Sequence, residues 1–257
     1  MKQFYETYNG NEIVAPLVRQ ISWTNNVLIL ASTHDMKEKE FYIKMCIKNN
    51  YSKRELARQI DSAYYQRYML SDGKAEISTD KLIDEEDYPD TKILDTYTLE
   101  FLDLPIHYTE KDLRQAIISN LKEFILEIGK DFTFISEEYR VQLDNRDYYI
   151  DLLFYNRTLK CLVAFELKIG EFKPEYISKM DFYLEILDRY EKKEDENPSV
   201  GIILCSDKSV KTVEFAMSRT MSPTLVSQYK LNLIDKELLE DKMREIEQIV
   251  KEQKSRD

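Results

Sequence analysis

The sequence has few of the side chains that build common metal clusters and catalytic triads. Its only histidines are His34 and His107, and its only cysteines, Cys46, Cys161 and Cys205, lie far apart without a CxxC pair. A histidine-based triad or a zinc cluster is therefore hard to assemble. Each cysteine stands in an apolar run, which predicts reduced, buried thiols. Any catalysis must rest on carboxylates and lysines.

Long apolar runs are also missing. No stretch approaches the roughly 18 to 20 apolar residues that a membrane-spanning helix needs, and the first ten residues, MKQFYETYNG, lack the apolar segment of a secretory signal. These absences predict a cytoplasmic protein that has no membrane partner. With 257 residues, 43% of them hydrophobic, the chain can bury the core of one large domain or of two small ones.

Nucleic-acid-binding proteins usually carry an excess of basic residues. This chain has the opposite balance, with a net charge of −11. The acidic residues are concentrated in one stretch, however. Between Glu76 and Asp103, ten acidic residues and two lysines carry a local charge of −8, which leaves −3 for the rest of the chain. The net charge therefore does not exclude a locally basic site.

The acidic stretch divides the chain. Residues 76–97 have little helical periodicity and contain DEEDYPD, which is typical of a connector. We therefore expect a helical domain over 1–75, a connector over 76–97, a second domain over 98–235 and a C-terminal helix over 236–257. Apolar residues recur in that last helix at steps of four, three and four, typical of a packing helix or, alternatively, of a short dimer seam.

In the first domain, the sequence predicts two helices joined by a short polar turn. The pair Asn49–Asn50 breaks the pattern, and Ser52 with Glu55 forms a capping box at the start of the second helix. Two interpretations stay open, a helix-turn-helix that contacts DNA phosphates and a plain helical hairpin with a solvated basic face. The basic residues on which the first interpretation depends are Lys53, Arg54, Arg58 and Arg67.

In the second domain, the pattern alternates between helices and strands. Thr109 is a candidate N-cap of a long amphipathic helix that ends at Gly129, and a second long helix follows Pro174. Four apolar runs between and after these helices predict strands, at 132–143, 148–155, 161–168 and 199–206. We expect an α/β (α+β) domain with a mixed four-stranded sheet flanked by helices, preceded by the small all-helical domain.

Two of these predicted strands carry charged side chains. Alternation along a strand places Glu166 and Lys168 on one face. If residues 157–160 form a four-residue hairpin loop, Asn156 faces Cys161 and Asp151 then faces Glu166. A slip of one residue would place the two carboxylates on opposite faces.

Two carboxylates side by side on a sheet repel each other, so a compensating charge is needed. A divalent cation is the simplest one, because Mg²⁺ binds through one or two carboxylates, and oxygen ligands also accept Mn²⁺. Lys168 would then stand beside the metal, placed to hold or activate water or to neutralise a phosphate. The alternative interpretation is an edge strand whose Glu166 and Lys168 lie in solvent. The buried context of Asp151 weakens this alternative, because aspartate is depleted in strands.

The run YYIDLLFYNRTLKCLVAFELKIGEFKPEYISKMDFYL, followed by DENPSVGIILCSDK, resembles the C-terminal domain of the YhcG family in the PD-(D/E)XK nuclease superfamily. Residues 4–60 are similar to the latter part of that family's helical N-terminal domain, although family members carry further helices before the segment that begins here at Met1. The resemblance implies a restriction-endonuclease-like fold and Mg²⁺-dependent cleavage of nucleic acid. It implies catalytic roles for Asp151, Glu166 and Lys168, and metal ligation by Asp151, Glu166 and the carbonyl of Leu167.

Two positions depart from the family pattern. Arg114 stands in a helix where an acidic residue is expected, although Asp112 or Glu123 could serve, and Lys179 stands where a glutamine is frequent. The added cation could bind phosphate or displace the metal. Candidate phosphate contacts near the site in sequence are Arg157, Lys160, Lys173 and Lys179.

These observations together predict a metal-dependent endonuclease that cuts DNA. Two other classes stay open: a nuclease fold that binds nucleic acid without cutting it, and an assembly subunit of a defence or recombination complex. A homo-oligomer is compatible with either class. Metal binding separates the enzyme from both alternatives, and salt-dependent binding of nucleic acid separates the binding module from the subunit.

Overall fold

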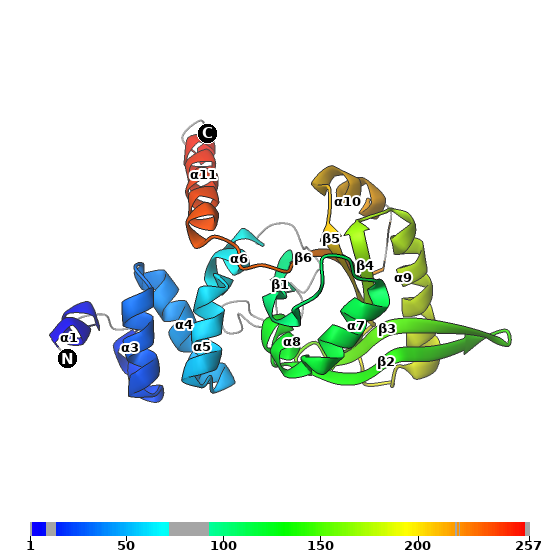
Figure 1. Cartoon of the computed structure of the whole chain (residues 1–257), viewed down its shortest axis with the longest axis horizontal. Coiled ribbons are helices and arrows are strands. Elements are labelled where there is room, and N and C mark those ends of the chain that lie inside the picture. Colours follow the sequence, from blue (N-terminus) through cyan, green and yellow to red (C-terminus); the bar gives the residue numbers. More distant parts are fainter. Residues whose placement is uncertain (1, 9–13, 72–92, 219, 221, 255–257) are drawn as a thin grey trace. The chain divides into compact units, whose positions relative to one another are not determined.

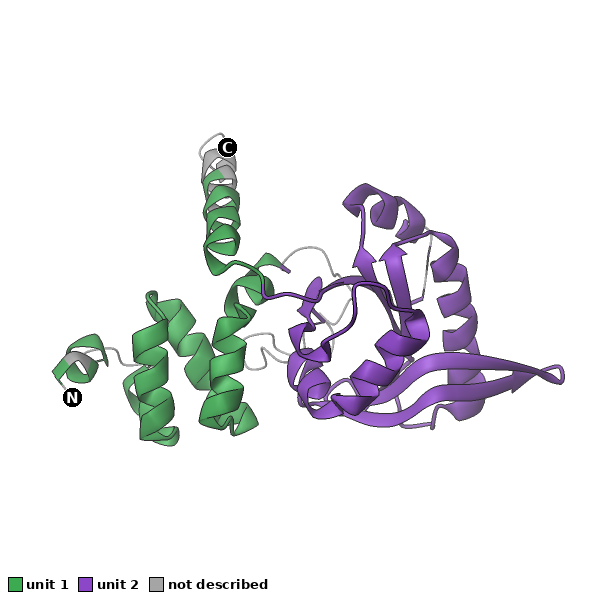
Figure 2. Ribbon diagram, viewed as in Figure 1, with its two compact units in different colours: residues 1–70, 234–257 green, residues 71–233 purple. Residues whose placement is uncertain are grey.

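The computed structural model describes residues 2–8, 14–71, 93–218, 220 and 222–254. The chain forms two compact units, one built from residues 1–70 and 234–257 and the other from residues 71–233 (Figure 2). Of the connector expected over 76–97, residues 76–92 lie outside the described residues, and residues 93–97 are described. Among the described residues, no helix is both long and apolar enough to cross a membrane.

The first unit is helical, and its turns follow from local capping. Asn50 is left-handed (φ 50°) at the end of one helix, and Ser52 and Glu55 form the expected capping box at the start of the next. The C-terminal helix belongs to this unit, because Lys236 pairs with the buried Glu38 at 2.7 Å. The helices are α1 (Lys2–Tyr8), α2 (Val14–Leu17), α3 (Trp23–Ser32), α4 (Met36–Asn49), α5 (Lys53–Asp61), α6 (Tyr64–Leu70) and α11 (Lys236–Lys254).

The second unit contains one mixed sheet, in the order β1-β6-β5-β4-β3-β2. Among the described residues the sheet has six strands, where the sequence predicted four. The two additional strands, one of them only three residues long, pair with each other in parallel, and this pairing joins distant segments that local patterns do not reveal. The strands are β1 (Thr96–Thr98), β2 (Phe132–Leu143), β3 (Arg146–Asn156), β4 (Cys161–Glu171), β5 (Val200–Asp207) and β6 (Thr224–Lys230).

The helix expected between Thr109 and Gly129 is broken in two, α7 (Glu110–Ser119) and α8 (Leu121–Ile128). Thr109 caps the first half, and Gly129 (φ 120°) ends the second, as expected. At Asn120 the side-chain amide donates to the carbonyl of Ala116 at 2.9 Å, and this local bond competes with helical continuation. The break lets α7 and α8 lie at different angles to the sheet (Figure 1).

Helices cover both faces of the sheet (Figure 1). On one face, Phe124 of α8 packs edge-on against Phe165, with ring centroids 5.9 Å apart. On the other, Met180 of α9 (Glu175–Ile186) is fully buried in a cluster that includes Ala164 and Leu153. A further helix, α10 (Val210–Met217), contributes partly buried residues to this second cluster. Alternation along β3 and β4 thus separates two apolar layers.

The β2–β3 hairpin is long, and its ladder is irregular. A two-residue turn, Asp144–Asn145, connects the strands with both residues left-handed, as a type I′ turn requires. The ladder shifts by one residue between Phe134 and Ser136, where β2 carries a bulge. Because β2 is an edge strand, this bulge also makes it a poor template for pairing with another chain.

Gly201 of β5 is packed too closely to carry a side chain. A Cβ there would lie 2.4 Å from Cγ and 2.7 Å from Sδ of the buried Met180. We expect Gly201→Ala to lower the free energy of unfolding by about 1–3 kcal/mol, because the core has no room for the added methyl group. Urea denaturation measures the loss. In a Met180→Ala background the same substitution should cost much less, and an equal cost in both backgrounds would contradict the assigned clash.

Candidate active site

Asp151 and Glu166 come together where two neighbouring strands part. β3 and β4 are paired from Asn156↔Cys161 to Leu152↔Phe165, which is the register expected for a four-residue hairpin loop. Asp151 and Glu166 follow directly after the last pair, and β4 continues there in parallel pairing with β5. Both carboxylates therefore lie on the face of the sheet that α9 covers.

Both oxygens of the Asp151 carboxylate have partners. The backbone N–H of Leu167 donates to Oδ2 at 2.8 Å, and Nη1 of Arg114 contacts Oδ1 at 3.3 Å. The side chain is only 16% exposed. Burial, and then the charge of the neighbouring Glu166, raise the pKa of Asp151. The chain thus holds a carboxylate in a setting that disfavours its negative charge.

Glu166 is the most deeply buried charged group of the site, with 1% of its side chain exposed. Its Oε1 atom accepts hydrogen bonds or ion-pair contacts from Lys168, at 2.8 Å, and from Lys179. Its Oε2 atom is buried and has no hydrogen-bond partner within the part of the chain that the structure describes. An unpartnered carboxylate oxygen in a buried position is costly, and a bound cation would satisfy it.

Lys168 links the carboxylate of Glu166 to Glu110, the first residue of α7. Its Nζ atom lies 2.8 Å from Oε1 of Glu166 and 2.9 Å from Oε2 of Glu110, and it stands over the ring of Tyr176 at 5.4 Å. Burial lowers the pKa of Lys168, but the hydrogen bonds and charges of Glu166 and Glu110 outweigh it, so the net pKa is raised. The ammonium group is therefore a fixed positive charge beside the two carboxylates.

Lys179 reaches the site from α9. Its side chain is 44% exposed and contacts Oε1 of Glu166, and its Nζ atom lies 5.4 Å from the ring centre of Tyr183. The hydroxyl of Tyr183 in turn donates to the carbonyl of Tyr149 at 2.7 Å, next to the parted strands. Burial lowers the pKa of Lys179, but its hydrogen bond to Glu166 outweighs this and raises it. Lys179 is thus the cation of the site that is most open to solvent.

The acidic residue that α7 brings to the site is Glu110, which sequence reasoning missed. The carboxylate of Asp112 accepts from the backbone N–H of Thr109 at 2.8 Å, and so it caps α7 instead. Glu123 belongs to α8, beyond the break at Asn120. The only sequence signal for Glu110 was its position as the first helical residue, where acidic side chains are common for electrostatic reasons alone.

The donor set suits a hard divalent cation held by few protein ligands. Among the described residues no group of three His, Cys, Asp or Glu side chains is arranged for a metal ion, so a zinc-type cluster is not available there. Two carboxylates, with the backbone carbonyl of Leu167 as the third expected ligand, match the few protein ligands that Mg²⁺ takes. The unpartnered Oε2 of Glu166 supports this fit.

The other predicted basic residues lie at different distances from the carboxylates. Arg157 and Lys160 are exposed in the β3–β4 turn, at the opposite end of the strands from Asp151, about 17 Å away at 3.3 Å per residue. Lys173 is exposed directly before α9, after the end of β4 that carries Lys168. The residues that lie in the first unit, on α5, are Lys53 and Arg54, both exposed, and Arg58, half-buried.

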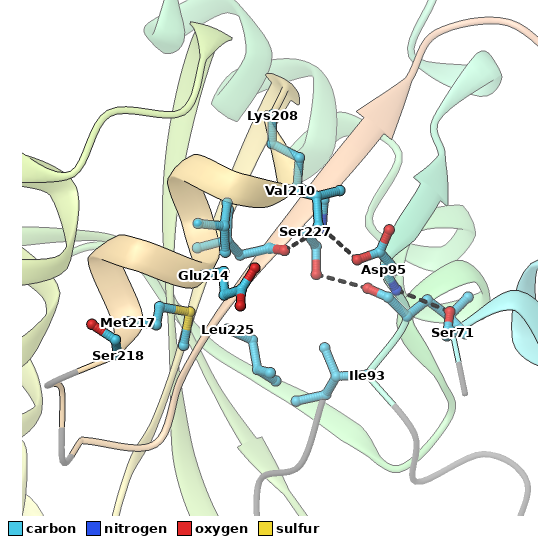
Figure 3. A pocket seen from close by; sticks show the side chains of 13 residues that line it. Ser71, Ile93, Asp95, Lys208, Val210, Glu214, Met217, Ser218, Leu225 and Ser227 are labelled. Atoms are coloured by element: carbon cyan, nitrogen blue, oxygen red, sulfur yellow. Dashed lines mark hydrogen bonds and ion pairs between the residues drawn. The ribbon is translucent and has the colours of Figure 1, made fainter. Parts of the chain in front are cut away.

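A cavity in the same unit does not coincide with the carboxylates. It has a volume of about 480 Å³ and lies between α10, β6 and residues 93–95 (Figure 3). Its polar wall is the ion pair of Lys208 with Asp95, 2.5 Å apart, and Lys208 also donates to the carbonyl of Val226. Its other walls are mainly apolar, including Val210 and Leu225. Through Lys208, the pair ties Asp95 to β6 at Val226.

Two family models match the chain. Residues 90–244 match the YhcG PDDEXK nuclease domain, and residues 1–67 match the DUF1016 N-terminal domain. The curated protein named "Putative nuclease YhcG", from Escherichia coli (strain K12), is 33% identical over 224 residues, which cover 87% of this chain. The chain spans 60% of that relative's length.

Two solved structures also resemble part of the chain. A repair endonuclease from Pyrococcus abyssi matches with a TM-score of 0.34 and 14% identity, covering 50% of each chain. A structure titled as a complex of EndoMS with double-stranded DNA matches with a TM-score of 0.32 and 14% identity, covering 52% of this chain and 49% of that one.

Proposed function

The chain belongs to the YhcG family of PDDEXK nuclease domains, and we propose that it hydrolyses phosphodiester bonds in DNA with Mg²⁺ or Mn²⁺ as cofactor. Asp151, Glu166 and Lys168 are the proposed catalytic residues. Asp151, Glu166 and the carbonyl of Leu167 are the proposed metal ligands. Because the chain spans only part of the relative's length, the proposal concerns the site described here.

One observation carries the proposal. A buried carboxylate, Glu166, and a partly buried one, Asp151, come from adjacent strands at the point where β3 and β4 part, and Oε2 of Glu166 has no hydrogen-bond partner among the described residues. The cost of placing like charges side by side on a sheet needs an offset. Lysines partly supply it at Oε1 of Glu166, but Oε2 stays available to a cation. This geometry favours a metal site over a stabilising ion pair.

The divalent cation would polarise a phosphoryl oxygen and lower the pKa of a bound water. Lys168 contributes a fixed positive charge, because Glu166 and Glu110 hold its ammonium group between them. In this position it stabilises negative charge that develops on a phosphate in the transition state. Arg114 and the Leu167 N–H orient the Asp151 carboxylate.

Contacts to the DNA backbone belong to the more exposed lysines. Lys179 is held by Glu166, and we expect a phosphate to attract it away once a cation neutralises that carboxylate. Lys173 lies before the same helix and extends this basic surface. In the helical unit, the residues proposed to contact phosphates are Lys53, Arg54 and Arg58.

A cleavage assay with controlled metal tests the proposal. The purified chain is incubated with supercoiled plasmid and with branched and single-stranded DNA, in Mg²⁺, in Mn²⁺ or in EDTA. We expect cleavage of at least one substrate with metal, its loss in EDTA, and its recovery when excess Mg²⁺ is restored. Equal results with metal and with EDTA on every substrate would contradict the proposal.

A second candidate function, binding of nucleic acid without cleavage, has one observation in its favour. Arg114 and Lys179, which replace an expected acid and glutamine, each contact one of the two carboxylates. If these cations displace the metal, the site holds phosphate instead of cutting it. Affinity for DNA that falls steeply with salt, without cleavage in any metal, would favour this candidate.

A further inference from the structure

Arg114 lies between Asp151 and two glutamates of the edge strand. Its Nη1 is 3.3 Å from Oδ1 of Asp151, its Nη2 is 2.8 Å from Oε1 of Glu138, and its Nε is 3.9 Å from Oε2 of Glu137. The arginine side chain is only 11% exposed. The shortest of the three contacts goes to Glu138 and not to the proposed metal ligand, so the guanidinium is drawn toward β2.

The register of the β2–β3 hairpin places Glu138 opposite Asp151. The residues on either side of Glu138 pair with those on either side of Asp151, Glu137 with Leu152 and Tyr139 with Ile150. The two-residue turn between Leu143 and Arg146 sets this register, and the one-residue shift lies beyond it, between Phe134 and Ser136. Glu138 is also left-handed (φ 44°), a conformation that costs a non-glycine residue about 1–2 kcal/mol. The backbone therefore supports an unusual position for this carboxylate.

Arg114 and a divalent cation would compete for the carboxylate of Asp151. A guanidinium paired with Asp151 alone would oppose a divalent cation at the same carboxylate, because both are positive and both need its oxygens. Glu138, at 2.8 Å, holds Arg114 on the β2 side, and Glu137 lies 3.9 Å from its Nε, beyond hydrogen-bond distance. The arginine can then orient Asp151 without neutralising it.

We propose that Glu138 is a positioning residue that holds Arg114 toward β2 and thereby keeps Asp151 available to a divalent cation. The inference rests on the metal site of the proposed function and deepens it. Glu138 acts through Arg114 and does not itself bind the metal.

A double-mutant cycle on metal affinity tests this inference. Mn²⁺, which oxygen ligands accept in place of Mg²⁺, is titrated into the full chain, and electron paramagnetic resonance measures the free ion. The four proteins are the wild type, Glu138→Gln, Arg114→Gln and the double variant. We expect Glu138→Gln to weaken Mn²⁺ binding about tenfold, within the range for residues that orient a metal ligand.

The effect of Glu138→Gln in the Arg114→Gln protein shows whether Glu138 acts through Arg114. In the Arg114→Gln background, Glu138→Gln should change the affinity by no more than about twofold, since there is no guanidinium left to hold. Glu185→Gln is the matched control and should leave the Mn²⁺ affinity unchanged. Glu185 of α9 is also exposed and also pairs with an arginine, Arg189. If Arg114→Gln fails to fold by circular dichroism, the neutral Arg114→Met replaces it.

Other outcomes overturn the inference in distinguishable ways. An unchanged affinity in Glu138→Gln shows that Glu138 has no such role. An equal loss in both backgrounds shows that it acts as a direct ligand or by its charge alone. If the wild type binds no Mn²⁺ at a site that Asp151→Asn removes, the proposed function fails, and the inference fails with it.

Discussion

Replacing Glu166 by glutamine should abolish metal-dependent cleavage and metal binding together. Its carboxylate is buried, and its Oε2 atom is the oxygen available to a cation. An amide cannot supply the negative charge that holds a divalent ion. Loss of about 4 kcal/mol of transition-state stabilisation corresponds to about a thousandfold slower cleavage. The rate is measured on the best DNA substrate, and binding by Mn²⁺ titration.

The shape of the side chain is kept in this variant, so folding should be kept as well. Lys168 retains Glu110 as a partner, and Lys179 is exposed enough to be solvated. Removing one of two repelling carboxylates should leave the melting temperature of the metal-free chain similar or higher. Glu185→Gln is the matched control. Cleavage at the wild-type rate in Glu166→Gln would remove Glu166 from the mechanism.

Replacing Lys168 by methionine should separate metal binding from catalysis. Methionine keeps much of the buried stem but removes the charge that lies between Glu166 and Glu110. We expect cleavage to slow about a hundredfold to a thousandfold, the usual loss when one charge-stabilising group is removed from a site. Mn²⁺ affinity should stay equal or rise, because a cation that competes for Oε1 of Glu166 is gone.

Measuring both cleavage and Mn²⁺ affinity distinguishes a role of Lys168 in the reaction from a role in metal binding. Cleavage and Mn²⁺ affinity are determined on the same preparations, with Lys211→Met, an exposed lysine of α10, as the control. A parallel loss of cleavage and of metal affinity would mean that Lys168 supports the metal site and not the reaction. An unchanged rate would mean that its two ion pairs serve stability alone.

Several features of the site were predictable because strands alternate strictly. The four-residue loop between Asn156 and Cys161 sets the register, and the period of two then places Asp151 near Glu166 on one face. The capping residues Ser52 and Thr109 were predictable for a similar reason, since each interacts with a residue only three positions away.

Interactions between distant segments were not predictable in this way. Strands β1 and β6 pair across more than a hundred residues of sequence, so neither shows a local pattern that requires the other. The split at Asn120 depends on a single side-chain bond that competes with an otherwise regular helical pattern. Arg67, in a basic stretch that suggested a DNA-facing helix, is instead buried and donates to the carbonyl of Ser62 at 2.9 Å.

The sequence by itself determined the chemistry that this protein can use, since it offers few histidines and cysteines and places Asp151, Glu166 and Lys168 on two adjacent strands. It also determined the order of the strands that carry the site, and the family. The tertiary structure alone decided which charges surround the carboxylates. Glu110 and Arg114 reach them from α7, Lys179 from α9 and Glu138 from a bulged edge strand. The physical reason is that alternation and capping act over a few residues, whereas electrostatic partners are set by helix docking and sheet irregularities, which depend on the whole fold.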